Sequence, residues 1–460
     1  MSVTCNSAII LAGGSGRRLR SSLPKAFHKI GGLSMLDHVI KSALEAGVDD
    51  ITAVINPAHE VFLRSGEFRE KVSVAHQAIP KGTGDGARCG AVNIKSSASE
   101  FAYLLYADIP LISSDTLKKL ARLAGECERT AVVVVAQAQD AADSSALGKL
   151  EPADAEGFLK SIIESQDSDL AATPACFLPF CNAGLLVRKD LLLDFLEKLV
   201  PSPATGELYV TGIVEYAYNA GYLCRYHVAD AEELLGANTC ADFAMLEKNF
   251  QQRMRKKHLD AGVIMRAPET VFFSFDTVIE HDVIINPYVV FGRHVHLKRG
   301  SIIESFCSID GSEVEAATIG PFARLRSGSK IHAGARIGNF VEIKNSDIAE
   351  KTKVNHLSYV GDSDVGEGCN IGAGVITCNY DGFQKHRTSI EKNVFVGSNA
   401  ALVAPLRIQA NAIVAAGSII TDSVEPDTLA IARSRQKNIS DGAVNFRNKK
   451  NKAKEKTCAE

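Results

Sequence analysis

Aliphatic residues recur at every sixth position through most of the second half of this sequence, and this period restricts the fold more than any other feature. An amphipathic helix repeats every ~3.6 residues and a half-buried strand every two, so neither explains it. A six-residue repeat is typical of a parallel β-helix, in which each repeat is one short strand whose aliphatic side chain points into a shared core. The repeat positions are Ile279, Ile285, Phe291, Leu297, Ile303, Ile309, Ile319, Leu325, Ile331, Ile337, Ile343, Ile348, Val354, Val360, Val365, Ile371, Ile390, Val396, Leu402, Ile408, Val414 and Ile420.

A polar segment, TCNYDGFQKHRTS at residues 377–389, interrupts this repeat, which then resumes at Ile390. Coils of a β-helix are stabilised mainly by their neighbours, so a loop can project from a corner at little cost. Loops on rigid scaffolds often carry binding or catalytic residues. Composition alone favours a solvated loop without function. The neighbouring segments NHLSYVG (355–361) and GNFVEIK (338–344) favour a functional loop, because they add histidine, tyrosine and lysine.

The first half of the chain has a different pattern, in which short apolar runs alternate with helical periods. This alternation predicts an α/β, Rossmann-like domain with a mostly parallel sheet and helices on both faces. Ligands of such sheets bind at the carboxyl ends of the strands. We expect strands at Ala8–Leu11, Ile51–Ile55, Phe101–Leu105 and Ala131–Ala136, and helices at Met35–Glu45, Asp115–Ala124 and Ala241–Ala261.

Composition narrows the class of protein. The chain has 460 residues and a net charge of −3, which gives no electrostatic reason to expect nucleic acid or an anionic membrane as a partner. No stretch approaches the ~20 apolar residues of a membrane span. The eleven cysteines are scattered without a CxxC pair, so we expect reduced thiols and a cytoplasmic protein.

A glycine-rich turn follows the first expected strand, in IILAGGSGRRLRSSLPK (9–25). Glycines allow backbone N–H groups to approach phosphates, and Arg18 and Lys25 supply positive charge. A dinucleotide-binding turn would carry a third glycine where Leu19 stands, and an acid at the end of the second strand, where ITAVIN (51–56) has none. The spacing of Arg18 and Lys25 instead resembles the sugar-nucleotidyltransferase signature.

Long motifs in both halves resemble one family. GPFARLRSG, GNFVEIKNS, NHLSYVGDSDVGEGCNIGAGVITCNYDG and VFVGSNAALVAP closely resemble the acetyltransferase half of the bacterial bifunctional enzyme that makes UDP-N-acetylglucosamine. The first half resembles its N-acetylglucosamine-1-phosphate uridylyltransferase domain. The resemblance implies a left-handed β-helix, a homotrimer, small-molecule substrates only, acetyl-CoA and UTP as co-substrates, and Mg²⁺. We then expect a uridylyltransferase domain at 1–240, a linker helix at 241–262, an acetyltransferase domain at 263–446 and a basic, disordered tail at 447–460.

The resemblance also implies the residues of an acetyltransferase site. His356 lies where the family has its general base, and histidine suits that role because it titrates near neutral pH. A fixed phosphate dianion calls for permanent cations, which the family supplies in its sugar-phosphate site. The implied sugar-phosphate residues are Arg326, Lys344, Tyr359 and Asn370, and the implied acetyl-CoA residues are Ala373, Asn379, Tyr380, Lys385, Ser398, Ala416 and Arg433.

In the first half, the family implies transfer of a uridylyl group from UTP to a sugar phosphate, with Lys25 and Arg18 as the catalytic cations. Asp108 in YADIPLI and Asn238 in LLGANT match the Mg²⁺ ligands. The implied UTP and UDP-sugar residues are Leu11, Gly14, Lys25, Gln77, Gly82, Thr83, Gly148, Glu164, Asn182 and Asn238.

Some segments depart from the family. ALGKL (146–150) stands where Gly-Tyr-Gly-Arg is usual, Gly212 stands where an acid is common, and Arg17 replaces a threonine. Two other functions remain open at this point. One is a monofunctional sugar-1-phosphate nucleotidyltransferase with a structural or regulatory β-helix, and the other is a catalytically inactive assembly subunit. Lys25, Asp108 and Asn238 argue against the inactive subunit, and His356 with the 377–389 loop argues against a purely structural β-helix.

Overall fold

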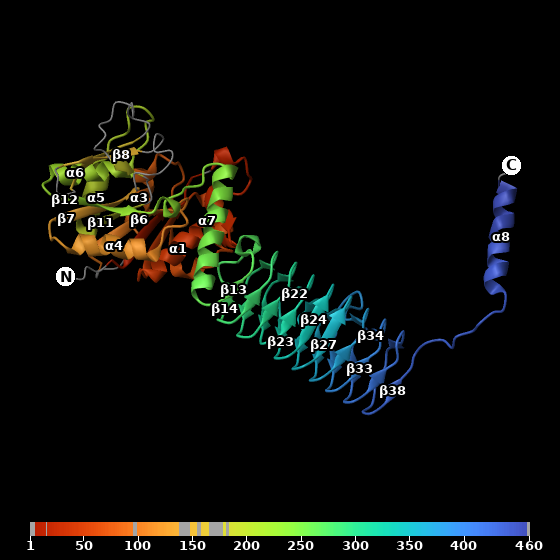
Figure 1. Ribbon diagram of the computed structural model, residues 1–460. Coiled ribbons are helices and arrows are strands. Elements are labelled where there is room, and N and C mark those ends of the chain that lie inside the picture. The colour runs from red at the N-terminus through yellow and green to blue at the C-terminus, as the bar shows by residue number, and fades with distance from the viewer. Residues whose placement is uncertain are drawn as a thin grey trace. The chain divides into compact units, whose positions relative to one another are not determined.

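The computed structural model describes residues 5–14, 16–94, 99–137, 148–153, 158–164, 178–180 and 184–457. The chain divides into two compact units. The first comprises Met1–Lys257 with Phe273–Phe275, and the second comprises His258–Phe272 with Asp276–Glu460. Each unit has its own fold: the first is an α/β structure, and the second is a stack of short strands (Figure 1).

A seven-stranded sheet forms the centre of the first unit. Strand β11 runs antiparallel to both of its neighbours, and the other strand pairs of this sheet are parallel. The four expected strands are all present and are one or two residues longer than expected, so the prediction of a Rossmann-like α/β domain is confirmed. In spatial order the strands are β12 (Leu223–Ala229), β7 (Thr130–Gln137), β11 (Gly184–Arg188), β6 (Phe101–Tyr106), β1 (Ser7–Leu11), β4 (Asp50–Ile55) and β5 (Val72–His76).

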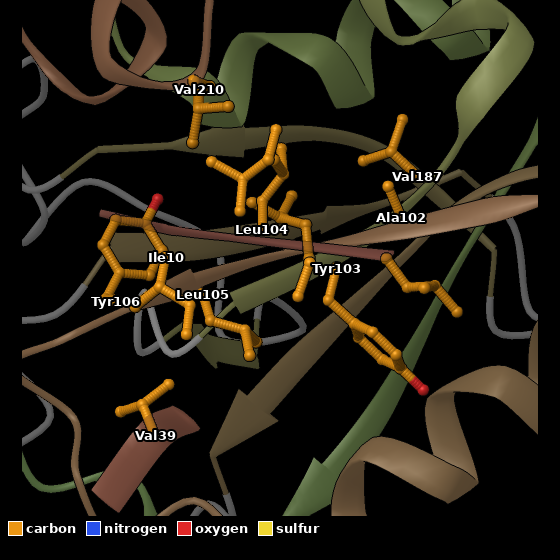
Figure 2. Close-up of a cluster of buried hydrophobic side chains, with 14 of the residues drawn as sticks. Ile10, Val39, Ala102, Tyr103, Leu104, Leu105, Tyr106, Val187 and Val210 are labelled. Carbon is orange, nitrogen blue, oxygen red and sulfur yellow. The ribbon is translucent and has the colours of Figure 1, made fainter. Parts of the chain in front are cut away.

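The core of this unit surrounds the central strands. Every residue of β6 is buried, which explains why its sequence is a continuous apolar run and not an alternating one. Figure 2 shows side chains of β6 packed with Ile10, Val39 and Val187. The helices are α1 (Met35–Glu45), α2 (Glu60–Leu63), α3 (Thr83–Ala91), α4 (Ser114–Gly125), α5 (Lys189–Lys198), α6 (Ile213–Asn219) and α7 (Cys240–Asp260).

Smaller elements complete the first unit. A three-stranded antiparallel sheet has the order β10 (Leu178–Phe180), β8 (Gly148–Pro152), β9 (Leu159–Ile163). Strands β2 (Lys29–Ile30) and β3 (Leu33–Ser34) form a hairpin before α1. The side-chain amide of Gln251 in α7 exchanges two 2.8 Å hydrogen bonds with the backbone of Phe273. These two buried hydrogen bonds join the helix that we expected at 241–261 to the segment Phe273–Phe275, which belongs to the first unit.

The second unit is a parallel β-helix with three sheets. The first sheet comprises β13 (Ile264–Met265), β15 (Ile284–Ile285), β18 (Ile302–Ile303), β21 (Thr318–Ile319), β24 (Arg336–Asn339), β27 (Lys353–His356), β30 (Asn370–Ile371), β33 (Phe395–Val396), β36 (Ile413–Val414) and β38 (Leu429–Ala430). The second comprises β14 (Val278–Ile279), β17 (His296–Leu297), β20 (Ser312–Val314), β23 (Ser329–Ile331), β26 (Asp347–Ile348), β29 (Ser363–Val365), β32 (Thr388–Ile390) and β35 (Leu406–Ile408). The third comprises β16 (Val290–Phe291), β19 (Ser308–Ile309), β22 (Arg324–Arg326), β25 (Glu342–Lys344), β28 (Tyr359–Gly361), β31 (Ile376–Cys378), β34 (Ala401–Val403) and β37 (Ile419–Ile420).

Every aliphatic position of the six-residue repeat is buried in the core of this β-helix, so the period predicted the fold correctly. One detail was wrong. The repeat continues at Thr377, six residues after Ile371, because Thr377 is 1% exposed and pairs in register with Leu402. Its hydroxyl accepts a 2.8 Å hydrogen bond from Gly361 N–H, so a polar side chain is satisfied in the column. The projecting loop therefore begins after this residue.

The end of the chain also differs from the expectation. Helix α8 (Gly442–Thr457) covers most of the segment that we expected to be a disordered tail. The segment contains five lysines, which have high helix propensity, and its described side chains are almost all exposed. Among the described residues, no helix is long and apolar enough to cross a membrane.

Candidate functional sites

The first unit has a cavity of about 240 Å³ at the carboxyl ends of the central strands. This is the position at which parallel α/β sheets bind ligands. Seven of the predicted nucleotide-site or metal-site residues line it: Leu11, Gly14, Lys25, Gln77, Gly82, Thr83 and Asp108.

The glycine-rich turn brings Lys25 to this cavity. Gly16 has a φ of +63°, which disfavours residues with a side chain. A Cβ atom there would lie only 2.6 Å from Lys25 Cβ. Gly16 therefore serves two needs, because it turns the chain and leaves room for the stem of Lys25.

The Lys25 ammonium lies between two oxygen atoms. Its Nζ is 2.6 Å from Asp108 Oδ2 and 2.9 Å from Asn238 Oδ1. The Arg18 guanidinium donates a 3.0 Å hydrogen bond to the same Asn238 oxygen. The structure thus joins both predicted catalytic cations to both predicted metal ligands, although the four residues are spread over more than two hundred positions of the sequence.

Asp242, at the start of α7, fixes the backbone of Asn238. The Asp242 carboxylate accepts hydrogen bonds of 2.9 and 2.8 Å from the backbone N–H groups of Asn238 and Thr239. Burial acts to raise the pKa of Asp242, but these N–H groups outweigh burial and lower the pKa overall. The carboxylate stays charged and fixes the backbone that presents the Asn238 amide.

Gln77 and Thr83 organise a further part of the cavity lining. The Gln77 amide is buried and donates to Gly82 O at 3.1 Å and to Asp85 Oδ2 at 2.8 Å, which fixes the start of α3. The Thr83 hydroxyl accepts a 3.0 Å bond from Val210 N–H. This bond attaches the segment that carries Glu207, whose side chain lines the cavity and was not predicted.

Two further predicted uridylyl-site residues that the structure describes, Glu164 and Gly148, do not line the cavity. Glu164 accepts a 2.6 Å hydrogen bond from the Thr211 hydroxyl, which links it to the wall segment. Gly148 begins strand β8 of the small sheet. Asn182 lies outside the described residues.

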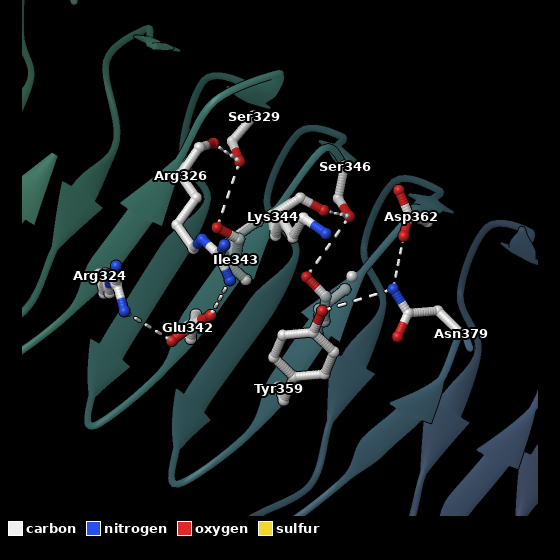
Figure 3. A network of polar contacts seen from close by, with 12 residues as sticks. Arg324, Arg326, Ser329, Glu342, Ile343, Lys344, Ser346, Tyr359, Asp362 and Asn379 are labelled. Atoms are coloured by element: carbon white, nitrogen blue, oxygen red, sulfur yellow. Dashed lines mark hydrogen bonds and ion pairs between the residues drawn. The ribbon is translucent and has the colours of Figure 1, made fainter. Parts of the chain in front are cut away.

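The second unit has a cationic cluster on the third sheet. Arg326 and Lys344 are register partners on neighbouring coils, so their side chains leave the β-helix on the same side (Figure 3). Glu342 lies beside them and accepts a 2.8 Å bond from Arg326 Nη1, and Arg324 Nη1 lies 3.6 Å from its second oxygen. Glu342 therefore orients the Arg326 guanidinium.

Tyr359 and the projecting loop extend this cluster. The Asn379 amide in the loop donates to Tyr359 OH at 3.4 Å and also to Asp362 Oδ2 (Figure 3). Burial acts to raise the pKa of Asp362, but hydrogen bonds from Asn345 and Asn379 and the charges of the nearby lysines lower it overall. Asp362 thus remains an anion that attaches the loop to the body of the β-helix.

Two lysine ammonium groups meet in this cluster. The hydrogen bond with Lys344, together with its positive charge, lowers the pKa of Lys385. Asp362 offsets this only in part. Lys344 and Lys385 carry two positive charges, and Asp362 supplies only one negative charge between them. The excess positive charge favours binding of a further anion, such as a phosphate.

The loop has an internal structure of its own. Asp381 accepts 2.7 Å bonds from the backbone N–H groups of Gln384 and Phe383 and from His386. The Gln384 N–H, His386 and the Phe383 N–H, in that order, lower the pKa of Asp381. Tyr380 and Lys385 form an antiparallel β-bridge across the turn. The loop is therefore a closed hairpin with fixed ends.

His356 lies at the end of strand β27, where its imidazole is exposed. Its Nδ1 lies 2.6 Å from Asn339 Oδ1 on the preceding coil. Three backbone hydrogen bonds connect the following coils in the same way. In each, the donor is the N–H of the residue that directly follows a column residue, and the acceptor is the carbonyl of the column residue one coil earlier. The bonds are Gly374 N–H to His356 O (3.3 Å), Asn399 N–H to Ala373 O (2.8 Å) and Gly417 N–H to Ser398 O (2.8 Å).

This pattern places His356, Ala373, Ser398 and Ala416 in one column along the β-helix. Arg433 extends the column, because its guanidinium donates to Ala416 O. The structure thus aligns the predicted base with most of the predicted acetyl-CoA residues. Asn370 is not part of the cationic cluster, since it lies in strand β30 on the first sheet, next to the strand that carries His356, whereas Arg326 and Lys344 lie on the third sheet.

Sequence reasoning missed four residues of these sites: Glu207, which lines the cavity, and Asp242, Glu342 and Asp362, which hold site residues in place. Only Glu342 carried a usable signal, because it precedes Lys344 by two residues in an expected strand and so lies on the same face. The others act through contacts that only the folded chain brings about.

The comparisons with known proteins agree with this arrangement. Residues 8–172 match the family model of a MobA-like NTP transferase domain, and residues 387–422 match a hexapeptide repeat of succinyl-transferase. The bifunctional protein GlmU of Zymomonas mobilis is 40% identical over 97% of this chain and 98% of its own length. The bifunctional protein GlmU of Jannaschia sp. is 39% identical over 94% of this chain and 93% of its own length. That of Agrobacterium fabrum is 39% identical over 97% of this chain and 97% of its own length. The chain is therefore a member of the bifunctional GlmU family.

Proposed function

We propose that this chain is a bifunctional enzyme of UDP-N-acetylglucosamine synthesis. Its β-helix, at 263–446, transfers acetyl from acetyl-CoA to the amine of glucosamine-1-phosphate. Its first domain, at 1–240, transfers a uridylyl group from UTP to the resulting N-acetylglucosamine-1-phosphate and releases pyrophosphate, and a helix at 241–262 links the two. The observation that carries this proposal is the His356 column beside a cluster of phosphate-binding cations, because a purely structural β-helix requires neither.

In the acetyl transfer, the amine nitrogen of glucosamine-1-phosphate attacks the carbonyl carbon of the thioester. His356 Nε2 takes a proton from this nitrogen as the C–N bond forms, and the C–S bond breaks to release the CoA thiolate. Arg326, Lys344 and Lys385 hold the sugar phosphate, so its amine is presented in a fixed orientation. The thiolate leaves as CoA after it gains a proton.

In the uridylyl transfer, a phosphate oxygen of the sugar phosphate attacks the α-phosphorus of UTP, and the bond to pyrophosphate breaks. Such transfers depend mainly on positioning and charge neutralisation. Lys25 and Arg18 supply positive charge to the phosphates. The buried Gln77 amide and the glycine-rich turn form the wall on which we propose that the nucleotide lies.

The residues at this site fit Mg²⁺. A cation, the Lys25 ammonium, already lies between a carboxylate oxygen of Asp108 and an amide oxygen of Asn238, and Mg²⁺ prefers oxygen ligands. Among the described residues, no cluster of three or more acidic, histidine or cysteine side chains could hold a metal, so phosphate oxygens and water molecules would complete the coordination of Mg²⁺. When bound, Mg²⁺ would neutralise charge on the phosphates.

We further propose a cytoplasmic homotrimer in which acetyl-CoA binds along the His356 column between subunits. Exposed apolar surface supports a contact between copies, because four aromatic rings stack along one corner of the β-helix with centroids 5.0, 4.8 and 5.1 Å apart. All four are about half exposed. The rings belong to Tyr288, Phe306, Phe322 and Phe340.

Reciprocal substitutions test the two activities. We expect His356→Ala to abolish release of CoA while uridylyl transfer to N-acetylglucosamine-1-phosphate continues. Asp108→Asn should have the opposite effect. If the unmodified protein released pyrophosphate but never CoA, the chain would be a monofunctional nucleotidyltransferase. If it released neither, it would be an inactive subunit.

A further inference from the structure

We propose that Asn339 is a positioning residue for His356, which fixes the imidazole in the tautomer that leaves Nε2 free to accept a proton. The inference rests on the proposed role of His356 as the general base. It assigns to Asn339 a part in acetyl transfer although this side chain contacts the reacting atoms only through the histidine.

The geometry of the two coils supports this role. Asn339 and His356 are register partners on β24 and β27, and Asn339 Oδ1 lies 2.6 Å from His356 Nδ1. The backbone around the histidine is fixed independently. His356 O accepts bonds from Ser358 Oγ at 2.8 Å and Gly374 N–H at 3.3 Å, and Leu357 N–H donates to Asn339 O at 3.1 Å. With the backbone held, the bond to Asn339 decides how the ring is rotated.

The chemistry of an amide oxygen decides the tautomer. Asn339 Oδ1 can only accept a hydrogen bond, so His356 Nδ1 must carry the hydrogen. A neutral imidazole has one N–H, and Nε2 is therefore the atom with the free lone pair. When Nε2 takes the proton of the substrate amine, Nδ1–H keeps its bond to Asn339 and the ring does not have to turn. Misplacement of a catalytic group by ~1 Å can cost about 100-fold in rate, so loss of the partner that orients this ring should be costly.

Asn339 orients the ring without adding charge. Among the described residues, no carboxylate forms a salt bridge with His356. A carboxylate in place of the amide would keep the acceptor but would favour the protonated imidazole, which is inactive as a base. The two properties of Asn339, an acceptor atom and neutrality, can therefore be separated by substitution.

The test compares Asn339→Ala and Asn339→Asp with the unmodified full-length protein by the rate of CoA release across pH. We expect Asn339→Ala to lower kcat about tenfold or more, because the ring is no longer oriented, with the KM values for glucosamine-1-phosphate and acetyl-CoA nearly unchanged. Asn339→Asp should recover much of kcat at alkaline pH, while the acid limb of its kcat profile moves upward by about one pH unit. Asn286→Ala is the matched control, because Asn286 directly follows strand β15 of the same sheet and its amide donates to Glu304 instead of orienting a histidine.

Uridylyl transfer and thermal unfolding of each variant show whether it is folded. If His356→Ala abolishes CoA release but Asn339→Ala keeps both the kcat and the pH profile of the unmodified protein, the inference about Asn339 is wrong and the proposed function stands. The inference is also wrong if Asn339→Asp loses activity equally at every pH, because that result indicates a structural role alone. If His356→Ala retains acetyl transfer, the base is elsewhere, so the role given to His356 and the inference about Asn339 both fall, while the acetyltransferase activity itself stands.

Discussion

Substitution of Gly338 by alanine tests how closely the coils must approach for the acetyltransferase site to form. A Cβ atom at this position would lie 1.9 Å from Asn355 O, whereas real Cβ contacts essentially never fall below 3.0 Å. The two strands would have to separate by the difference, 3.0 − 1.9 = 1.1 Å. Neighbouring strands are about 4.8 Å apart, so this is a large displacement, and the obstructing atom belongs to the backbone and cannot rotate away.

Two consequences follow from this displacement. Overpacking of this kind costs about 1–3 kcal/mol of stability. The distance between Asn339 Oδ1 and His356 Nδ1 would grow from 2.6 Å by the same 1.1 Å to 3.7 Å, which is too long for a hydrogen bond. We therefore expect CoA release to fall by up to about 100-fold, because a misplacement of ~1 Å can cost that much. Pyrophosphate release by the first domain should not change.

The assay measures CoA release with a thiol reagent and pyrophosphate release in parallel samples. Gly300→Ala is the matched control, because Gly300 also lies in the β-helix and has a φ of +79°, but its nearest outside atom would be an ordinary 3.5 Å away. This control should lose about 1–2 kcal/mol through backbone strain and keep acetyl transfer. If Gly338→Ala instead keeps the CoA-release rate and stability of the unmodified protein, the close approach of these coils is not what builds the site.

Three further predictions concern other parts of the two sites. Lys25→Met should increase the affinity of the nucleotide-free protein for Mn²⁺ several-fold, measured by electron paramagnetic resonance, because it removes the cation that lies between Asp108 and Asn238. Because Lys344 lowers the pKa of Lys385 and a bound phosphate would raise it again, binding of glucosamine-1-phosphate at alkaline pH should take up protons. Calorimetry in buffers of different ionisation heat measures this uptake. Ile343→Ala should destabilise the β-helix by about 2–5 kcal/mol in urea unfolding, because Ile343 is fully buried.

Each of these predictions has a control and a contradicting result. Unchanged or weaker Mn²⁺ binding by Lys25→Met would show that Lys25 does not compete for the metal ligands. Lys385→Met should abolish the proton uptake, and uptake that persists in this variant belongs to another group. The exposed Lys330→Ala should change stability by less than about 0.5 kcal/mol, and an equal loss at both positions would contradict the burial argument.

The fold was predictable where packing imposes a period. The six-residue repeat identified the β-helix because each aliphatic side chain must enter the same core, and the apolar runs identified the central strands of the first unit. Thr377 was missed for a physical reason: its hydroxyl is satisfied inside the column by Gly361 N–H, so a polar residue occupies a position that a search for aliphatic residues excludes. The helix at Gly442–Thr457 was missed because it has no apolar face to reveal it.

The sites were predictable only residue by residue, through resemblance. No period relates Lys25 to Asp108 and Asn238, because the folded sheet alone brings them together. Asp362 also gave no signal, since it acts as an anchor only when the loop folds back and Asn379 reaches it. Residues that contact substrates are thus easier to find in a sequence than residues that hold them in place.

The most direct test of the account is the release of CoA by the purified full-length protein from acetyl-CoA and glucosamine-1-phosphate, with UTP and Mg²⁺ withheld. We predict that free CoA appears at a rate that depends on both substrates, and that His356→Ala abolishes it while pyrophosphate release remains intact once UTP, Mg²⁺ and N-acetylglucosamine-1-phosphate are supplied. Absence of CoA release from the folded, unmodified protein would contradict the bifunctional assignment.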